Sequence, residues 1–258
     1  MLRPRIIPCL LVKNGGLMKT VNFKIPKYVG DPINAVRIFN EKEVDELIVL
    51  DIDATRERRE PDYLMIERLA SECRMPLCYG GGVRSLDQAM RIFALGVEKI
   101  AISTIAVERP EFVSELAEHV GRQSVVVVMD VKKTNAGYRL FLNNATDATE
   151  LAPVEFAKRM EELGAGEIVI NSIDQDGVMK GYDLELVRLI RPAVTVPITV
   201  LGGAGKLEHI QALIREFGII GAAAGSLFVF KGVFRAVLIN YPTPGDKDAL
   251  IRSSLWGT

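Results

Sequence analysis

Short apolar runs rich in β-branched residues alternate along the chain with longer segments in which apolar residues recur three or four positions apart. Runs of the first kind are typical of buried parallel strands, and segments of the second kind of the amphipathic helices that connect them. The pattern predicts eight strands, at residues 5–12, 46–51, 76–80, 99–103, 125–130, 167–172, 198–202 and 221–225.

Six connecting segments carry the helical period, at residues 33–44, 85–95, 109–120, 153–163, 183–190 and 207–217. Eight strands with helices between them predict an α/β fold, a single (βα)8 TIM barrel that occupies residues 1–258 as one domain.

The chain also resembles itself. Residues 79–104 align without gaps with residues 201–226, an offset of 122, and this alignment matches paired glycines and Thr104 with Ser226. The segments VKNGGLMKT and VKKTNAGYRL, after the first and fifth strands, each place a turn between two extended arms. We therefore expect two similar half-barrels, about 1–124 and 125–258, within the one domain.

Composition adds few constraints. The 258 residues carry 32 Lys and Arg against 33 Asp and Glu, a net charge of -1, so we expect neither nucleic acid nor a membrane surface as partner. No apolar run reaches the length that spans a bilayer and no signal peptide opens the chain, so a cytoplasmic protein is expected. Three cysteines lack metal-binding spacing, and we expect reduced, buried thiols, no metal site and no cofactor.

Two glycine-rich loops follow predicted strands, GGGVRS at 80–85 and GGAGK at 202–206, and each has a partner loop containing small hydroxyl residues. Backbone N–H groups in such loops can bind a phosphate, although glycines at these positions can also serve only to make tight turns. Together the loops predict two anion sites that one bisphosphorylated ligand could span. The expected residues are Gly82, Ser103, Thr104, Asp176, Gly177, Gly203, Gly225 and Ser226.

The motifs RIIPCL, KTVNF, DELIVLDI, GGGVRS, ELGAGEI, SIDQDG and GGAG occur in this order over nearly the whole chain. With them the chain resembles the cyclase subunit of imidazole glycerol phosphate synthase. The resemblance implies a barrel that receives ammonia from a separate glutaminase subunit. At its opposite end such a barrel uses the ammonia on a bisphosphorylated intermediate of histidine synthesis.

The resemblance also implies two catalytic carboxylates, at position 11 and at Asp130. Position 11 is Leu here, and an alkyl group can neither take nor give a proton. Nearby positions depart from the family as well: Leu201 replaces a serine, Ser103 an asparagine and Asn171 a hydroxyl residue. We therefore expect a changed substrate or a lost chemical step, while Asp130 serves either catalysis or structure.

Four charged residues, Arg5, Glu46, Lys99 and Glu167, each open a predicted strand. Taken alone, the pattern favours solvated side chains; if they turn inward they must pair, because an isolated charge inside a barrel is costly. The resemblance assigns all four to a charged ring at the bottom of the barrel, an ammonia gate where the glutaminase docks.

Three hypotheses follow. In the first, the barrel couples to a glutaminase and delivers ammonia to a sugar amidotransferase that amidinates a surface-polysaccharide sugar. PCLLVK and NSIDQDG resemble the branch of the family with that role. In the second, the chain is a true cyclase of histidine synthesis in which another group replaces the missing carboxylate. In the third, it is a noncatalytic barrel that only activates a glutaminase. Lys19 is a weaker site candidate that could equally be solvated, and Asp176 could equally cap a turn.

Overall fold

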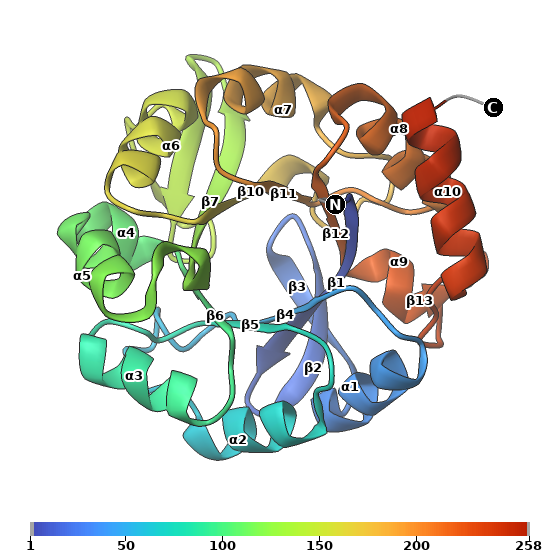
Figure 1. Cartoon of the computed structure of the whole chain (residues 1–258), viewed down its shortest axis with the longest axis horizontal. Coiled ribbons are helices and arrows are strands. Elements are labelled where there is room, and N and C mark those ends of the chain that lie inside the picture. The colour runs from blue at the N-terminus through green and yellow to red at the C-terminus, as the bar shows by residue number, and fades with distance from the viewer. Residues whose placement is uncertain (1–2, 257–258) are drawn as a thin grey trace.

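The computed structural model describes residues 3–256 and contains a closed barrel of eight parallel strands surrounded by helices (Figure 1). The barrel strands are β1 (Arg5–Lys13), β4 (Leu47–Asp51), β5 (Leu77–Gly80), β6 (Lys99–Ile102), β7 (Val125–Thr134), β10 (Glu167–Ser172), β11 (Ile198–Leu201) and β12 (Gly221–Ala224). Each pairs with its neighbours in parallel, and pairing of β12 with β1 and of β7 with β10 completes the circle. All eight predicted strands are confirmed, as is the (βα)8 fold.

The outer helices are α1 (Pro32–Glu41), α2 (Tyr63–Glu72), α3 (Leu86–Ala94), α4 (Thr104–Glu108), α5 (Glu111–Val120), α6 (Pro153–Glu162), α7 (Leu184–Ile190), α8 (Leu207–Phe217), α9 (Ser226–Val229) and α10 (Pro244–Trp256). The six predicted segments each overlap one of them. The first prediction runs too far, because α1 ends at Glu41 and Glu43 has a left-handed φ of 50°. Ser85 begins α3 with a capping box formed with Gln88.

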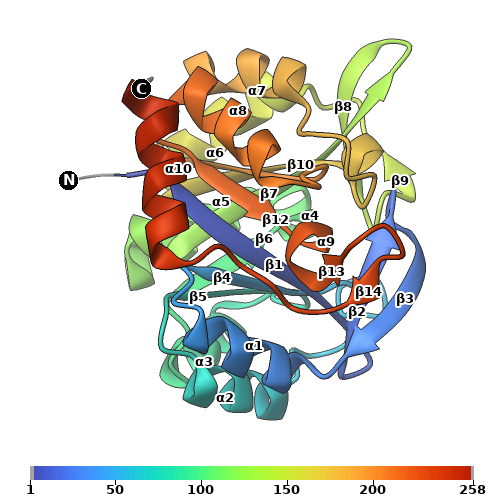
Figure 2. The same ribbon diagram turned by 90° about the vertical axis from the view of Figure 1, so that its right-hand side faces the viewer.

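Antiparallel hairpins extend the barrel beyond the carboxyl ends of its strands (Figure 2). After β1 come β2 (Gly16–Val21) and β3 (Lys24–Gly30), and after β7 come β8 (Gly137–Leu142) and β9 (Asp147–Ala148). Both predicted turns are therefore confirmed. In the first turn Asn14 and Gly15 have positive φ, 49° and 72°, as a tight hairpin turn requires. A third hairpin, β13 (Phe230–Lys231) with β14 (Ala236–Val237), follows α9. The division into two half-barrels stays a prediction.

Side chains of the barrel strands alternate between two cores, because successive residues of a strand face opposite sides. One core lies between the barrel and its helices. The other fills the inside of the barrel and is made of Ile7, Cys9, Ile48, Cys78, Ala101, Val126, Val128, Val169, Leu201 and Ala223. Cys9 and Cys78 are buried free thiols as predicted, but Cys73 is only partly buried where α2 ends.

Helix α10 packs against α8 and is fastened to the bottom of the barrel by a buried lysine. Lys247 Nζ donates to Asp45 Oδ1 at 2.7 Å and to the carbonyl of Glu43 at 3.1 Å. Asp45 in turn accepts from the amide of Ile6. No helix among residues 3–256 is long and apolar enough to cross a membrane.

Candidate functional site

A pocket opens at the carboxyl ends of the barrel strands, the end where loops and hairpins follow the sheet. Every residue predicted for catalysis or phosphate binding lines it, and the fold therefore brings together positions up to 215 residues apart. These lining residues are Leu11, Gly82, Ser103, Thr104, Asp130, Asp176, Gly177, Gly203, Gly225 and Ser226.

Asp130 lies on β7 with a carboxyl group that is held by two neighbours. Asn171 Nδ2 on β10 donates to its Oδ1 at 2.8 Å, and Ser103 Oγ lies 3.5 Å from its Oδ2. Desolvation in the pocket raises the pKa of Asp130 to about 7, aided by the nearby negative charge of Asp176 and opposed by the two hydrogen bonds. Near neutral pH this carboxyl group can therefore either donate or accept a proton.

Across the barrel interior Leu11 continues the apolar side of the pocket. It pairs with Leu50 of β4 in the ladder, and both side chains pack on the interior core that also contains Leu201. Leu11, Leu50 and Leu201 all line the pocket, and Leu11 stands at the position where the family resemblance implies a carboxylate. No proton can be exchanged at this side chain.

Both predicted anion cradles lie in the pocket, with different backbone environments. In the first, the N–H of Gly82 donates to Thr55 Oγ1 at 3.2 Å, so this amide is already paired within the chain. In the second, Gly203 has φ of 109°, and a Cβ there would lie 1.9 Å from the carbonyl oxygen of Gly181. Gly225 is the N-cap residue of α9 and has no side chain that could cap the helix. These glycines therefore fix close backbone contacts as well as opening the pocket.

Lys19 and Asp176 join the first hairpin to the pocket wall. Lys19 on β2 is buried, and its Nζ donates to the carbonyl oxygen of Cys9 at 2.9 Å, so a solvated role for it is wrong. Burial lowers the pKa of Lys19, against the opposing effects of Cys9 and Asp176. Asp176 Oδ2 accepts from Thr20 Oγ1 at 2.7 Å and from the amide of Phe23 at 3.0 Å. Asp176 therefore bonds to the distant β2–β3 hairpin through its side chain, and it also lines the pocket.

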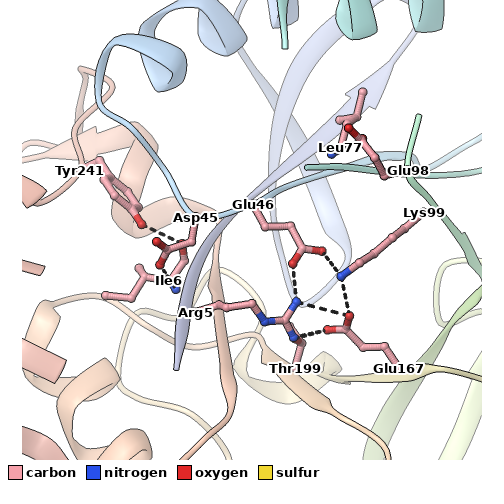
Figure 3. A network of polar contacts seen from close by, with 10 residues as sticks. All are labelled: Arg5, Ile6, Asp45, Glu46, Leu77, Glu98, Lys99, Glu167, Thr199 and Tyr241. Atoms are coloured by element: carbon pink, nitrogen blue, oxygen red, sulfur yellow. Dashed lines mark hydrogen bonds and ion pairs between the residues drawn. The ribbon is translucent and has the colours of Figure 1, made fainter. Parts of the chain in front are cut away.

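At the opposite end of the barrel the four charged strand-opening residues form one network (Figure 3). Arg5 bonds to Glu46 and, through Nη2 at 2.7 Å, to Glu167. Lys99 Nζ lies 2.7 Å from Glu46 Oε1 and 2.8 Å from Glu167 Oε2. Two cations and two carboxylates therefore alternate around the bottom of the barrel.

The two carboxylates of this ring are buried, and ion pairs shift pKa values within the ring. Glu46 and Glu167 are 3% and 4% exposed, so the interpretation of these residues as solvated is wrong. Burial alone would raise the pKa of Glu167, but the ion pairs with Arg5 and Lys99 lower it to about 2. The same carboxylates raise the pKa of Lys99 against the effect of its own burial. Arg5, Lys99 and Glu167 therefore remain charged at neutral pH.

Sequence reasoning missed Thr199 as a member of the ring. Its buried hydroxyl donates to Glu167 Oε1 at 2.6 Å and accepts from Arg5 Nη2 at 3.3 Å. Gly221 makes room for it, because a Cβ there would lie 1.9 Å from Thr199 Oγ1. In the sequence Thr199 and Gly221 are only a threonine and a glycine in two predicted strands, a pattern that is not specific for such a contact.

Known proteins match this chain over most of its length. The family model "Histidine biosynthesis protein" matches residues 5–235. A protein of Leptospira interrogans, named as a candidate imidazole glycerol phosphate synthase subunit HisF, is 58% identical over 97% of this chain and 99% of its own. A Vibrio vulnificus protein, similarly named subunit hisF3, is 57% identical over 96% of both chains. A Pseudomonas aeruginosa protein, similarly named subunit hisF2, is 53% identical over 94% of this chain and 97% of its own.

The matched segment contains all eight barrel strands, the charged ring and the residues that line the pocket at the carboxyl ends of the strands, which we call the mouth of the barrel. Fold, site and similarity therefore agree, and the chain belongs to the histidine biosynthesis protein family as a cyclase-like barrel subunit of the HisF type.

Proposed function

We propose that this barrel takes ammonia from a glutaminase docked on its charged ring and delivers it, at the mouth, to a reaction other than imidazole glycerol phosphate formation. The observation that carries the proposal is the contrast between the two ends of the barrel. Leu11 stands where the family resemblance expects a carboxylate, while Arg5, Glu46, Lys99 and Glu167 form a complete network.

The energetic cost of the ring supports a use for it. Apolar side chains of similar size would fill the bottom of a barrel without desolvating four charges, and replacing buried ion pairs in that way is often neutral or stabilising. Folding alone therefore gives no reason to retain them. A polar entrance that leads into an apolar interior is a suitable path for the small, neutral ammonia molecule. The family resemblance implies the same role for the ring, as the entrance for ammonia.

The mouth supports a changed chemistry. Asp130, whose pKa lies at about 7, is suited to general acid–base work, but the facing side chain is Leu11. A positioned acid or base typically contributes about 100- to 10,000-fold to a rate, so cyclisation in the manner of the family should be slowed by about that factor. Because its expected catalytic partner is missing, we assign Asp130 a role in binding ammonia or the ammonia acceptor.

Phosphate binding remains part of the proposal. Support comes from the second cradle, where Gly203, Gly225 and Ser226 line the pocket together. For the first cradle we assign the anion to Thr104 at the start of α4, because the amide of Gly82 is paired with Thr55.

We further propose that the acceptor is a surface-polysaccharide sugar amidinated by a third protein, a sugar amidotransferase, in the cytoplasm. This part rests on the likeness of PCLLVK and NSIDQDG to that branch of the family. The two alternatives are a true cyclase, which the names of the relatives favour, and a noncatalytic activator of glutaminase.

One assay separates these three functions. The purified barrel is given ammonium salt and the bisphosphorylated histidine-pathway intermediate, and cyclised product is measured. We expect little or no turnover. A rate within about tenfold of a family member with both carboxylates would refute the changed function, because loss of an acid–base residue typically costs more than that.

The second arm mixes the barrel with its glutaminase, the sugar amidotransferase of the same organism and the sugar acceptor, and measures glutamine hydrolysis and amidinated product. Both should rise, and Lys99→Ala should reduce transfer of ammonia more than it reduces folding. Hydrolysis that rises without any dependent product would favour the noncatalytic activator. If no glutaminase from the same organism binds the ring face, the whole proposal fails.

A further inference from the structure

Two hairpins at the mouth of the barrel expose large apolar side chains. On β3, Ile25 and Tyr28 are 83% and 63% exposed; in the turn between β13 and β14, Val233 and Phe234 are both 96% exposed. Single exposed apolar residues are ordinary on a protein surface, but a cluster at the tips of projecting hairpins marks an interaction site. Figure 2 shows both hairpins at the end of the barrel where the strands finish.

The two hairpins lie beside one another and beside the pocket. Lys27 Nζ of β3 lies 5.8 Å from the ring centroid of Phe230 at the start of β13. In the β2–β3 ladder Lys27 pairs with Lys19, whose Nζ would meet a Cβ on Gly225 at 2.5 Å. The exposed apolar cluster is therefore part of the rim of the mouth.

The two hairpins carry only positive charge. Their apolar residues alternate with four exposed cations, Lys24, Lys27, Lys231 and Arg235. Residues 14–30 and 217–245 contain no Asp or Glu. Among residues 3–256 none of these four cations lies within ion-pairing distance of a carboxylate. We call these eight residues, four apolar and four cationic, the mouth-rim surface.

We propose that the mouth-rim surface docks the enzyme that consumes the ammonia, through a face of that enzyme that is apolar at its centre and acidic at its edge. The proposal rests on the function proposed above, since it needs ammonia to leave at the mouth. Charge complementarity selects the partner, because four unpaired cations favour a carboxylate-rich surface and repel a basic one. The apolar residues then supply the desolvated centre that specific interfaces have.

Two other occupants fit less well. A second copy of this chain in a symmetric contact would press the four cations of one mouth-rim surface against the same four of the other. An anionic membrane would satisfy the charges, but it would cover the mouth with a surface that contains no acceptor for ammonia. A docked enzyme seals the exit and receives the solute there.

The test uses the purified barrel with its glutaminase and the purified sugar amidotransferase of the same organism. One variant replaces the apolar tip, Val233→Ser with Phe234→Ser, and a second reverses charge, Lys27→Glu with Lys231→Glu. The matched control is Leu64→Ser on α2, a residue that is 68% exposed and outside the mouth-rim surface. Affinity for the amidotransferase is measured by calorimetry, and amidinated product is measured with glutamine and with ammonium salt.

We expect each double variant to weaken binding of the amidotransferase by about thirtyfold or more, which is the loss of one interface hot spot. Glutamine-driven product should fall, whereas product from ammonium salt and stimulation of the glutaminase should be unchanged. The Leu64→Ser control should bind like the wild type.

Each failure has a distinct meaning. If the wild-type barrel supports no glutamine-driven product, the proposed function and the docking both fall. If the wild type supports it and both double variants bind as tightly as the control, only the docking is refuted. If the wild type binds vesicles of phosphatidylglycerol and phosphatidylcholine, and the double variants lose this binding but still bind the amidotransferase, the mouth-rim surface binds a membrane instead. If the wild type self-associates in sedimentation and the double variants do not, the mouth-rim surface binds a second copy of the chain.

Discussion

Replacing Glu167 by glutamine removes one charge from the ring while keeping its shape. The carboxylate is 4% exposed and accepts bonds from Arg5, Lys99 and Thr199. Its pKa of about 2, against an ordinary 4.5, corresponds to about 3 kcal/mol of stability at neutral pH. Removing one partner of a buried ion pair commonly costs about 3–5 kcal/mol, so both routes give a loss of about 3 kcal/mol.

The stability difference between the wild type and Glu167→Gln should depend on pH. Because the folded-state pKa of Glu167 lies below its unfolded value, the stabilisation is complete above pH 4.5 and is lost as the pH falls toward about 2. The wild type should therefore exceed Glu167→Gln by the full amount at pH 7, and the difference should shrink below pH 4.5. Urea unfolding followed by circular dichroism at pH 7, 5, 4 and 3 measures it.

A surface ion pair supplies the control. Glu185 bonds to Lys133 at 2.7 Å with both side chains more than half exposed. Glu185→Gln should change stability far less than Glu167→Gln does at pH 7, because solvent screens an exposed ion pair. Equal effects of the two substitutions, or a loss at Glu167 that stays constant from pH 7 to pH 3, would show that the ring is not a buried electrostatic network.

Two further predictions concern the mouth. Since the native Asp130 carboxyl group, with its pKa at about 7, holds a proton more tightly than the unfolded chain, the wild type should lose stability from pH 4 to 7. Asp130→Asn should not lose this stability. Between pH 5 and 8 its free energy of unfolding in urea should rise by about 1 kcal/mol or more relative to that of the wild type. Parallel plots of unfolding free energy against pH for the two proteins would contradict this. Gly203→Ala should destabilise by about 3 kcal/mol or more because its Cβ meets Gly181, whereas Gly15→Ala, with open space around it, should cost about 1 kcal/mol in thermal melts. Similar losses at both glycines would contradict the close contact.

Much of the fold could be predicted from sequence because a parallel barrel buries both faces of its strands. Such strands appear as continuous runs of β-branched residues, and the connecting helices show their period of 3.6. Helix α10 escaped this reasoning, since polar Lys247 and Ser254 lie among its buried residues. The Lys247–Asp45 bond joins positions 202 residues apart, and no local pattern indicates it.

Part of the candidate site was predictable from sequence. Glycines after strands indicated loops that the structure places in the pocket, and the family resemblance drew attention to position 11, which is Leu. The pairing of Gly82 with Thr55 and the entry of Thr199 into the ring were not predictable, because each depends on how strands and loops meet once the barrel has closed. The four charged residues show the same limit, since at strand starts they are usually solvated.

The two ends of the barrel differ in what folding alone would favour. At the mouth, Leu11 and Leu201 replace residues that would carry polar groups in the cyclase family, and an apolar side chain against the interior core stabilises the fold. At the bottom, apolar residues would serve stability equally well, yet the sequence retains four charges and Gly221, which makes room for Thr199. Selection for stability alone would have simplified both ends. The contrast between the polar bottom and the apolar mouth therefore supports the proposal that ammonia enters through the ring and that cyclisation no longer follows.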